Sequence, residues 1–251
     1  LSAAIRLYHR LELTKALRGF DDALSAVAGW KTAAGFRASC RWTLGDNAGA
    51  IADAKLAAKL KPNDAQSYAS RGRALLVLKD YEGALADFRT VAEEDARSIE
   101  GPLGEGGLFS AQGKNREALK ALNRAVSLDP GSAAALLLRG AVKDRLGDFS
   151  GASSDYGALL EINPNFAWAH YYRGKSHREL KDYRAAEADF SAFISAVAEN
   201  ESAHYLRSNV RFLLGDYKGA LSDLSKTIAL NPRNGLAYSN RGQTLAQLGD
   251  K

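Results

Sequence analysis

Arginine and aspartate recur together in this sequence at a spacing that would let them form ion pairs. Each pair is sixteen residues apart: Arg37 and Asp53, Arg71 and Asp87, Arg139 and Asp155, Arg173 and Asp189, and Arg207 and Asp223. Where the series has Glu105 in place of arginine, it also has Ala121 in place of aspartate. We therefore expect each pair to bridge two helices, with a contribution of about 0 to 1 kcal/mol if the pairs are exposed. The alternative is that independent surface charges were duplicated together with a repeat.

The residues that could bind a metal ion do not have the spacing of a metal site. Of the four histidines, His9, His170, His177 and His204, the second and fourth are 34 residues apart and share one column. We expect these two to pack within the fold, because no carboxylate or cysteine recurs beside them at metal-ligand spacing. The aspartates recur every 34 residues, whereas a calcium loop needs ligands two residues apart. The sequence predicts no metal site.

The motifs of common catalytic and phosphate-binding sites are missing. No serine stands in the G-x-S-x-G turn that exposes a nucleophile. The glycine-rich stretch at Gly104, Gly106 and Gly107 has no strand before it and no Lys-Ser/Thr pair after it, as a phosphate loop requires. We therefore expect no enzymatic activity and no cofactor.

The charged pairs belong to a repeat of 34 residues that runs through most of the chain. Two further columns keep this register: alanine at Ala50, Ala84, Ala118, Ala152, Ala186 and Ala220, and proline at Pro62, Pro130, Pro164 and Pro232. Within each repeat, two segments with apolar residues at helical spacing meet at a turn such as Gly147-Asp148 or Gly215-Asp216. Glycine suits a left-handed helix end, and aspartate suits capping the next helix. The pattern predicts helix–turn–helix hairpins.

The small residues at Gly72, Gly106, Gly140, Gly174 and Ser208, together with the alanine and proline columns, resemble those of the tetratricopeptide repeat family. The resemblance implies an all-α fold, a right-handed superhelical solenoid of hairpins. We expect a single array over residues 1–251. It comprises a degenerate hairpin at 1–30, full repeats at 31–64, 65–98, 99–132, 133–166, 167–200 and 201–234, and a partial repeat at 235–251. Because such arrays need polar ends, we expect the chain to continue beyond residue 251 or a partner to cover this end.

Two parts of the array depart from the common pattern. In the hairpin at 1–30, we expect Leu13 and Leu17 on the first helix and Ala23, Leu24 and Val27 on the second. In the repeat at 99–132, Gly101 and Pro102 stand near the start of the first helix together with further glycines. Because glycine and proline disfavour helix interiors, this start is expected to be weak or irregular.

The resemblance also implies a binding surface, because the first helix of each hairpin lines the concave groove in this family. Its second, fifth, sixth, ninth and twelfth positions place these residues in the groove: Trp42, Leu76, Leu137, Leu138, Trp168, Tyr171, Tyr172, Lys175, Tyr205, Leu206, Asn209, Phe212 and Asn240. Aromatic groups of this kind are typical of interaction sites. The alternative is that they pack against neighbouring repeats. Asn209 and Asn240 resemble part of the family's two-carboxylate clamp, but Tyr205 replaces its lysine, so no chaperone clamp is expected.

These features predict a non-enzymatic scaffold or adaptor that binds a peptide or helix of a partner protein in its groove. The alternatives are a structural subunit of a larger assembly and a docking module of a longer chain. The net charge of +5 is not gathered into a basic stripe, so we expect no nucleic-acid partner. Because Cys40 is the only cysteine, an intramolecular disulfide is excluded. The sequence has no run of about 18 apolar residues, so we expect no membrane insertion by this segment. We expect a soluble protein, with the cytoplasm favoured.

Overall fold

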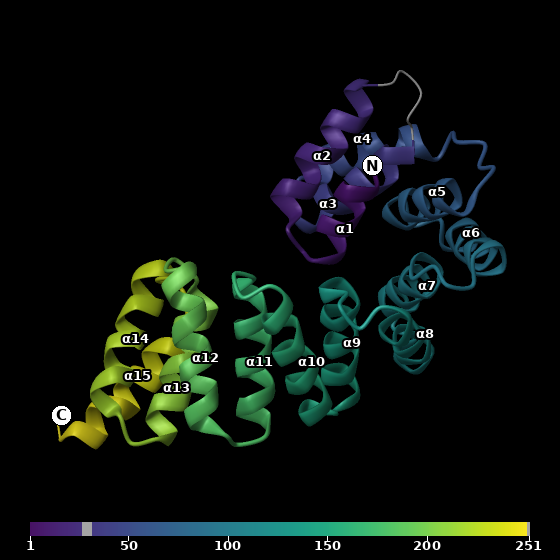
Figure 1. Ribbon diagram of the computed structural model, residues 1–251. Coiled ribbons are helices and arrows are strands. Elements are labelled where there is room, and N and C mark those ends of the chain that lie inside the picture. Colours follow the sequence, from purple (N-terminus) through teal and green to yellow (C-terminus); the bar gives the residue numbers. More distant parts are fainter. Residues whose placement is uncertain (27–31, 250–251) are drawn as a thin grey trace. The chain divides into compact units, whose positions relative to one another are not determined.

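The computed structural model describes residues 1–26 and 32–249, which form two compact units, Leu1–Leu146 and Gly147–Lys251. The first unit contains α1 (Ser2–His9), α2 (Leu13–Ala26), α3 (Thr32–Thr43), α4 (Asn47–Ala57), α5 (Ala65–Val77), α6 (Tyr81–Glu94), α7 (Glu100–Ala111), α8 (Asn115–Leu128) and α9 (Ala133–Leu146). The second contains α10 (Phe149–Ile162), α11 (Ala167–Glu179), α12 (Tyr183–Ala196), α13 (Glu201–Leu213), α14 (Tyr217–Leu230) and α15 (Gly235–Leu248). All regular structure in the described residues is helical (Figure 1), which confirms the all-α class.

The helices pair into hairpins in the register that the sequence predicts. The first helices α5, α9, α11, α13 and α15 begin at Ala65, Ala133, Ala167, Glu201 and Gly235. In each unit, the two helices of a hairpin pack on each other, as α5 does on α6 and α13 on α14. The second helix also packs on the next first helix, as α6 does on α7 and α12 on α13. This is the expected solenoid of hairpins, while the continuity of one array over residues 1–251 stays a prediction.

The turns inside the hairpins have the predicted chemistry. Gly113 and Gly215 take positive φ angles of 74° and 80°, which glycine adopts without strain. Lys79 and Lys181 take the same left-handed conformation, with φ of 64° and 62°. The aspartate at the next helix start accepts a hydrogen bond from the backbone N–H three residues later, as Asp216 does, and so caps the helix.

The hairpin at the N-terminus differs from the expectation. Its first helix is α1, so Leu13 and Leu17 lie on the second helix, α2, together with Ala23 and Leu24. The turn between them is made by Leu11 at a φ of 58°, a conformation that favours glycine and that no Gly-Asp pair marks in the sequence. Val27 lies outside the described residues.

The expected irregular start of the repeat at 99–132 is also wrong, because α7 is helical from Glu100 onward. Pro102 stands in the first turn, where backbone N–H groups have no partner within the helix and a proline loses no hydrogen bond. The glycines make room for large neighbours. A Cβ at Gly104 would lie 2.3 Å from the Phe88 ring, and one at Gly106 would lie 2.5 Å from Leu122.

The same contact between a small and a large residue holds other hairpins together. Gly72 on α5 faces Phe88 on α6, and Gly174 on α11 faces Phe190 on α12, with added Cβ atoms at 2.8 and 3.0 Å from the rings. Both phenylalanines are fully buried. The small column therefore lets the two helices approach until the aromatic ring fills the space between them. No helix among the described residues is long and apolar enough to cross a membrane.

Candidate binding surfaces on the first helices

The arginine–aspartate pairs form bidentate ion pairs inside the hairpins. Four pairs are seen within the two units: Arg37 with Asp53, Arg71 with Asp87, Arg173 with Asp189, and Arg207 with Asp223. In one of them, Arg71 Nε and Nη2 donate to the two oxygens of Asp87 at 2.8 and 2.7 Å. These hydrogen bonds raise the pKa of Arg71 above its usual value. The bridge hypothesis is confirmed for these four pairs, while Arg139 and Asp155 belong to different units and their pairing stays a prediction.

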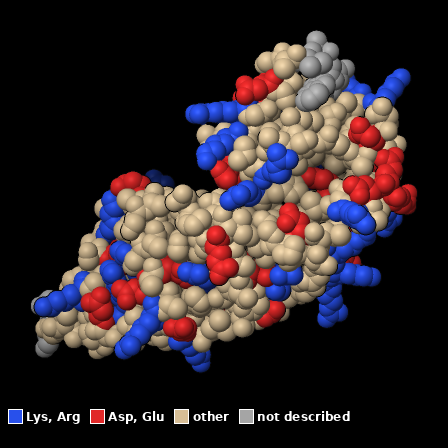
Figure 2. Space-filling view, in the orientation of Figure 1, with Lys and Arg blue, Asp and Glu red and all other residues tan. Residues whose placement is uncertain are grey.

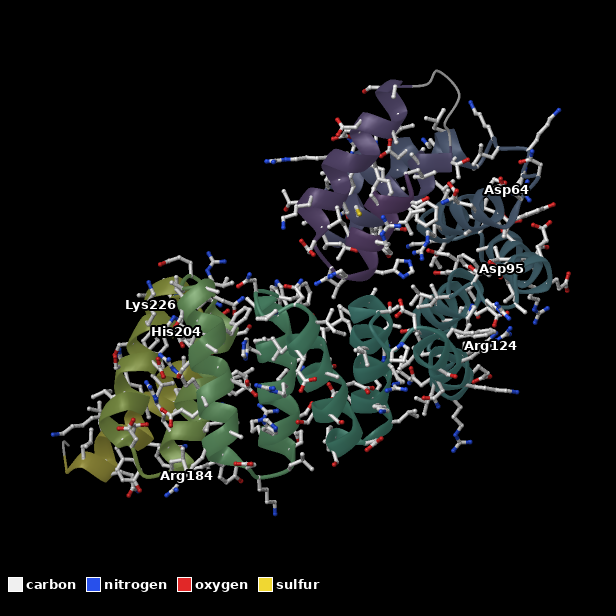
Figure 3. The ribbon with its side chains drawn as sticks, viewed as in Figure 1. Asp64, Asp95, Arg124, Arg184, His204 and Lys226 are labelled. Carbon is white, nitrogen blue, oxygen red and sulfur yellow. The ribbon has the colours of Figure 1, made fainter. Side chains whose placement is uncertain are left out.

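The aspartates of these pairs are buried, whereas the contribution of about 0 to 1 kcal/mol expected from the sequence applies to exposed pairs. Asp87 and Asp223 are each 3% exposed. Asp223 also accepts a hydrogen bond from Arg211 Nη1 at 3.0 Å. The Nδ1 atom of His204, which is labelled in Figure 3, lies 3.2 Å from Asp223 Oδ1. Because a buried carboxylate loses its hydration, these partners replace water and fix the hairpin geometry.

Histidine and aspartate therefore meet in the structure, although no carboxylate recurs beside His170 and His204 at metal-ligand spacing along the sequence. His170 Nδ1 lies 3.0 Å from Asp189 Oδ1, and the same atoms of His204 and Asp223 are 3.2 Å apart. The carboxylate comes nineteen residues later, on the facing helix of the hairpin. Within the described residues no group of histidine, cysteine and acidic side chains has the arrangement of a metal site. The structure gives these two histidines the packing role that was expected.

Ser153, His177 and Asp189 resemble a catalytic triad in their distances. Ser153 Oγ lies 2.7 Å from His177 Nε2, and His177 Nδ1 lies 3.1 Å from Asp189 Oδ2. However, the second contact lacks hydrogen-bond geometry, and Asp189 already holds Arg173 and His170. Ser153 stands inside α10, where the backbone N–H groups are used by the helix and cannot form an oxyanion hole. We assign these three side chains to packing between hairpins.

In the first unit, the groove positions meet around one cavity of about 330 Å³. Trp42, Leu76 and Leu138 come from α3, α5 and α9 and line it together. Trp42 is 45% exposed, which is unusual for so large an apolar side chain. Leu137, the fourth groove residue predicted for this unit, does not line the cavity.

The aromatic residues predicted on α11 form one cluster that is partly a packing feature. The ring centroid of Trp168 lies 5.4 Å from that of Tyr171 and 6.0 Å from that of Tyr172. Tyr171 also contacts the buried ring of Phe193 at 5.1 Å, so it belongs largely to the core of its own hairpin. Burial raises the pKa of both tyrosines. Lys175 lies over the Tyr171 ring, with its Nζ atom 5.9 Å from the centroid.

Two first helices, α13 and α15, carry polar side chains at predicted groove positions. Asn240 Nδ2 donates to Asn209 Oδ1 at 2.9 Å and to the Tyr205 hydroxyl at 3.2 Å. Asn209, Phe212 and Asn240 line a cavity of about 210 Å³. Leu206, by contrast, packs on the buried cluster of Phe190 and Val210, so the packing alternative describes it better than the groove.

One group of buried polar residues was not predicted. His9 Nε2 on α1 lies 2.7 Å from Glu100 Oε1 on α7. Arg73 on α5 pairs with Glu100, and its Nη1 donates to the Tyr8 hydroxyl at 3.0 Å. Burial acts to raise the pKa of Glu100, but the charges of Arg73 and His9 outweigh it and lower that pKa to about 2.

The positions of this group carried a signal in the sequence. Arg73 stands at the ninth position of the repeat at 65–98, and Glu100 stands at the second position of the next repeat. The second and ninth positions of a repeat are both among those that the family resemblance assigns to the groove, as are the positions of Trp42 and Leu138. Opposite charges at groove positions of adjacent repeats would have suggested a pair there, but nothing in the repeat pattern pointed to Tyr8 and His9.

Comparisons with known proteins agree with this architecture. YrrB, described as a TPR protein with an unusual peptide-binding site, matches with a TM-score of 0.66 and 20% identity, over 75% of this chain and 97% of that chain. PilF of Pseudomonas aeruginosa matches with a TM-score of 0.67 and 18% identity, over 90% of this chain and 99% of that chain. A chain of the APC/C hetero-tetramer Cut9–Hcn1 matches with a TM-score of 0.69 and 16% identity, over 96% of this chain and 48% of that chain. No curated protein gives a significant sequence match.

At these identities, the solved structures show the likeness of fold alone. A protein-family model, described as tetratricopeptide repeat, matches residues 37–99, 103–165, 142–201 and 171–230 of the sequence. Together these residues make up more than half of the chain. The chain belongs to the tetratricopeptide repeat family.

Proposed function

We propose that this protein is a non-enzymatic scaffold or adaptor that binds a peptide or helix of a partner protein along its first helices. The observation that carries the proposal is that predicted groove residues line a cavity in each unit. Trp42 and Leu138 line the cavity of about 330 Å³, and Asn209 and Phe212 line the cavity of about 210 Å³. Concave sites with apolar walls and a few polar groups are typical of ligand binding.

The cavity in the second unit has the chemistry to hold a peptide backbone. Asn240 Nδ2 is engaged with Asn209 Oδ1, which orients the two amides with respect to each other. The Asn209 Nδ2 donor and the Asn240 Oδ1 acceptor then match a peptide carbonyl and a peptide N–H. Phe212 and the exposed Leu213 supply an apolar wall beside them. This combination supports an extended segment as the ligand of the second unit.

The surface charge supports a protein partner rather than a nucleic acid. Figure 2 shows lysine and arginine interspersed with aspartate and glutamate on the face in view, without a continuous basic stripe. Binding to a phosphate backbone needs a row of basic groups and falls steeply with salt.

The test compares capture of partner proteins from a matched cell extract by four forms of the chain. Beside the wild type, Trp42→Ala with Leu138→Ala removes the apolar wall in the first unit, and Asn209→Ala with Phe212→Ala removes the amide site in the second. We expect at least one of these variants to lose partners that the wild type captures and that are identified by mass spectrometry.

The control variant truncates exposed apolar side chains on a second helix. Ile51 and Leu56 on α4 are 38% and 39% exposed, close to Trp42 in exposure, and they lie outside the groove positions. Ile51→Ala with Leu56→Ala should keep all partners. Circular dichroism establishes that each variant is folded. Loss of partners in the control, with full capture by both groove variants, would contradict the proposal.

The alternative is a structural subunit, or the docking module of a longer chain, that is held through its outer surface. It is favoured by one observation, the exposure of Tyr238 at 44% on α15, at a position outside the groove positions. Tyr238→Ser should leave capture unchanged if the groove is the site. If this substitution releases the partners and the groove variants do not, the structural role takes the lead.

A further inference from the structure

We propose that α1 is an internal ligand of the groove in the first unit, and that a partner helix with the same contact chemistry displaces it. Such a helix presents an aromatic hydroxyl and an imidazole at adjacent positions, as Tyr8 and His9 do. The proposal deepens the function above, since it rests on partner binding in the groove and specifies the form of the ligand and its competitor.

The position of α1 is that of a bound ligand. Tyr8 contacts Arg73 on α5, His9 contacts Glu100 on α7, and α1 also packs on α9. It therefore touches the first helices of three successive hairpins. Figure 1 shows α1 on the inner side of the curve that α3, α5, α7 and α9 make. Because first helices line the groove in this family, α1 occupies the place of a partner.

The floor of this site is built for polar side chains. Arg73 and Glu100 are 6% and 8% exposed, and burying such charges is unfavourable unless every one of them is paired. Two of their partners come from α1. Tyr8 accepts a hydrogen bond from Arg73, its ring centroid lies 4.9 Å from the guanidinium carbon, and His9 reaches the second oxygen of Glu100. A helix with an aromatic hydroxyl beside an imidazole satisfies both charged groups.

The element that fills the site is weakly held in its own right. α1 has eight residues, and isolated helices shorter than about 12 residues are marginal in water. It joins α2 through Leu11 at a φ of 58°, where a branched side chain is strained. Its docking therefore depends on its packing against α2 and on its contacts with Arg73, Glu100 and α9.

α1 also leaves part of the groove empty, which gives a partner the means to compete. The cavity of about 330 Å³ lies between Tyr8 of α1 and the apolar side chains of Trp42 and Leu138. A longer helix that repeats the contacts of Tyr8 and His9 and adds an apolar side chain toward Trp42 buries surface that α1 leaves exposed. That additional burial favours the partner over the internal helix.

The chain carries its own reporter for this displacement. Cys40 on α3 is the only cysteine and is fully buried. It lies close enough to Tyr8 and Arg73 to interact with them electrostatically, and burial raises the pKa of its thiol to about 12. Because only the thiolate reacts readily, Cys40 should resist thiol reagents while α1 is docked and react when α1 leaves.

The experiment measures Cys40 labelling and peptide binding on the full chain. Tyr8→Phe with His9→Ala weakens α1, and Arg6→Ala, at an exposed position of the same helix, is the control. Loss of hydrogen bonds to charged groups should speed Cys40 labelling in the double variant by about tenfold or more, with no change in the control. A fluorescent peptide of residues 1–12 should bind the double variant at least about tenfold more tightly than the wild type, because it no longer competes with a tethered helix.

Two further forms make the result specific. The same peptide with Tyr8→Ala and His9→Ala should not bind, and adding Glu100→Gln to the double variant should abolish binding of the original peptide. If circular dichroism shows that the double variant is unfolded, His9→Ala alone replaces it. Unchanged Cys40 labelling would overturn the proposal. So would faster labelling without peptide binding, since α1 would then be a structural cap. Either result leaves partner capture by the groove unaffected, and loss of groove-dependent capture leaves the labelling result unaffected.

Discussion

The ion pair of Arg71 and Asp87 should stabilise its hairpin far more than a surface pair does. Asp87 is 3% exposed, and Arg71 donates two hydrogen bonds to it from the facing helix. Breaking a fully buried pair costs about 3 to 5 kcal/mol, because one charge stays buried without a partner. The Arg71 side chain is 29% exposed, and water reaching it reduces the effect. We expect Arg71→Ala to lower the free energy of unfolding by about 2 to 3 kcal/mol.

A double-mutant cycle separates the pair from the loss of the two side chains. Arg71→Ala, Asp87→Ala and the double variant are unfolded in urea, and hydrogen exchange in α5 and α6 gives the local free energy, since repeat arrays can unfold in parts. The coupling energy should be about 1.5 to 3 kcal/mol. The matched control is Lys226 with Glu199, an exposed pair at 2.9 Å, for which about 0 to 1 kcal/mol is expected (Figure 3). Equal coupling in the two cycles would refute the argument from burial.

Three further predictions test other parts of the structure. Because the pKa of Glu100 is lowered from 4.5 to about 2, its contribution to stability should be complete above pH about 4.5 and lost as the pH falls toward 2; Glu100→Gln should remove this pH dependence in urea unfolding. Lys181→Gly should raise the melting temperature, with a gain of about 1 kcal/mol from relief of the positive φ, whereas Lys181→Ala should give none. Gly104→Ala should destabilise the first unit by about 1 to 3 kcal/mol through its clash with Phe88, while Gly107→Ala, with its nearest neighbours at 3.9 and 4.0 Å, should be neutral or stabilising in the same denaturation assay.

Features that the repeat itself imposes could be predicted from the sequence. The turn at Gly215-Asp216 has the left-handed glycine and the capping aspartate because both depend on neighbouring residues. The pair of Arg71 and Asp87 was predictable because one hairpin geometry recurs and the two columns vary together. The burial of Asp87 could not be predicted, because the sequence pattern does not show whether the arginine or the aspartate of each pair lies inside the packed helices.

Features that depend on contacts outside the repeat were missed. The contact of His9 with Glu100 joins residues 91 positions apart and occurs once, so no periodicity reveals it. The first helix of the N-terminal hairpin was misplaced because Leu11 makes its turn without glycine. Mapping by repeat position also cannot tell a groove residue from a core residue when the side chain is large. Leu206 packs on the core beside Phe190, whereas Phe212 lines the cavity of about 210 Å³.

The central claim, that the first helices hold a partner polypeptide, is tested most directly by photo-crosslinking in cells that express the chain. A benzophenone amino acid replaces Phe212 in the cavity of the second unit or Trp42 in that of the first, and Ile51 on α4 serves as the control. The account predicts covalent adducts with a partner polypeptide from the Phe212 or Trp42 position and none from Ile51. Adducts from Ile51 alone would contradict it.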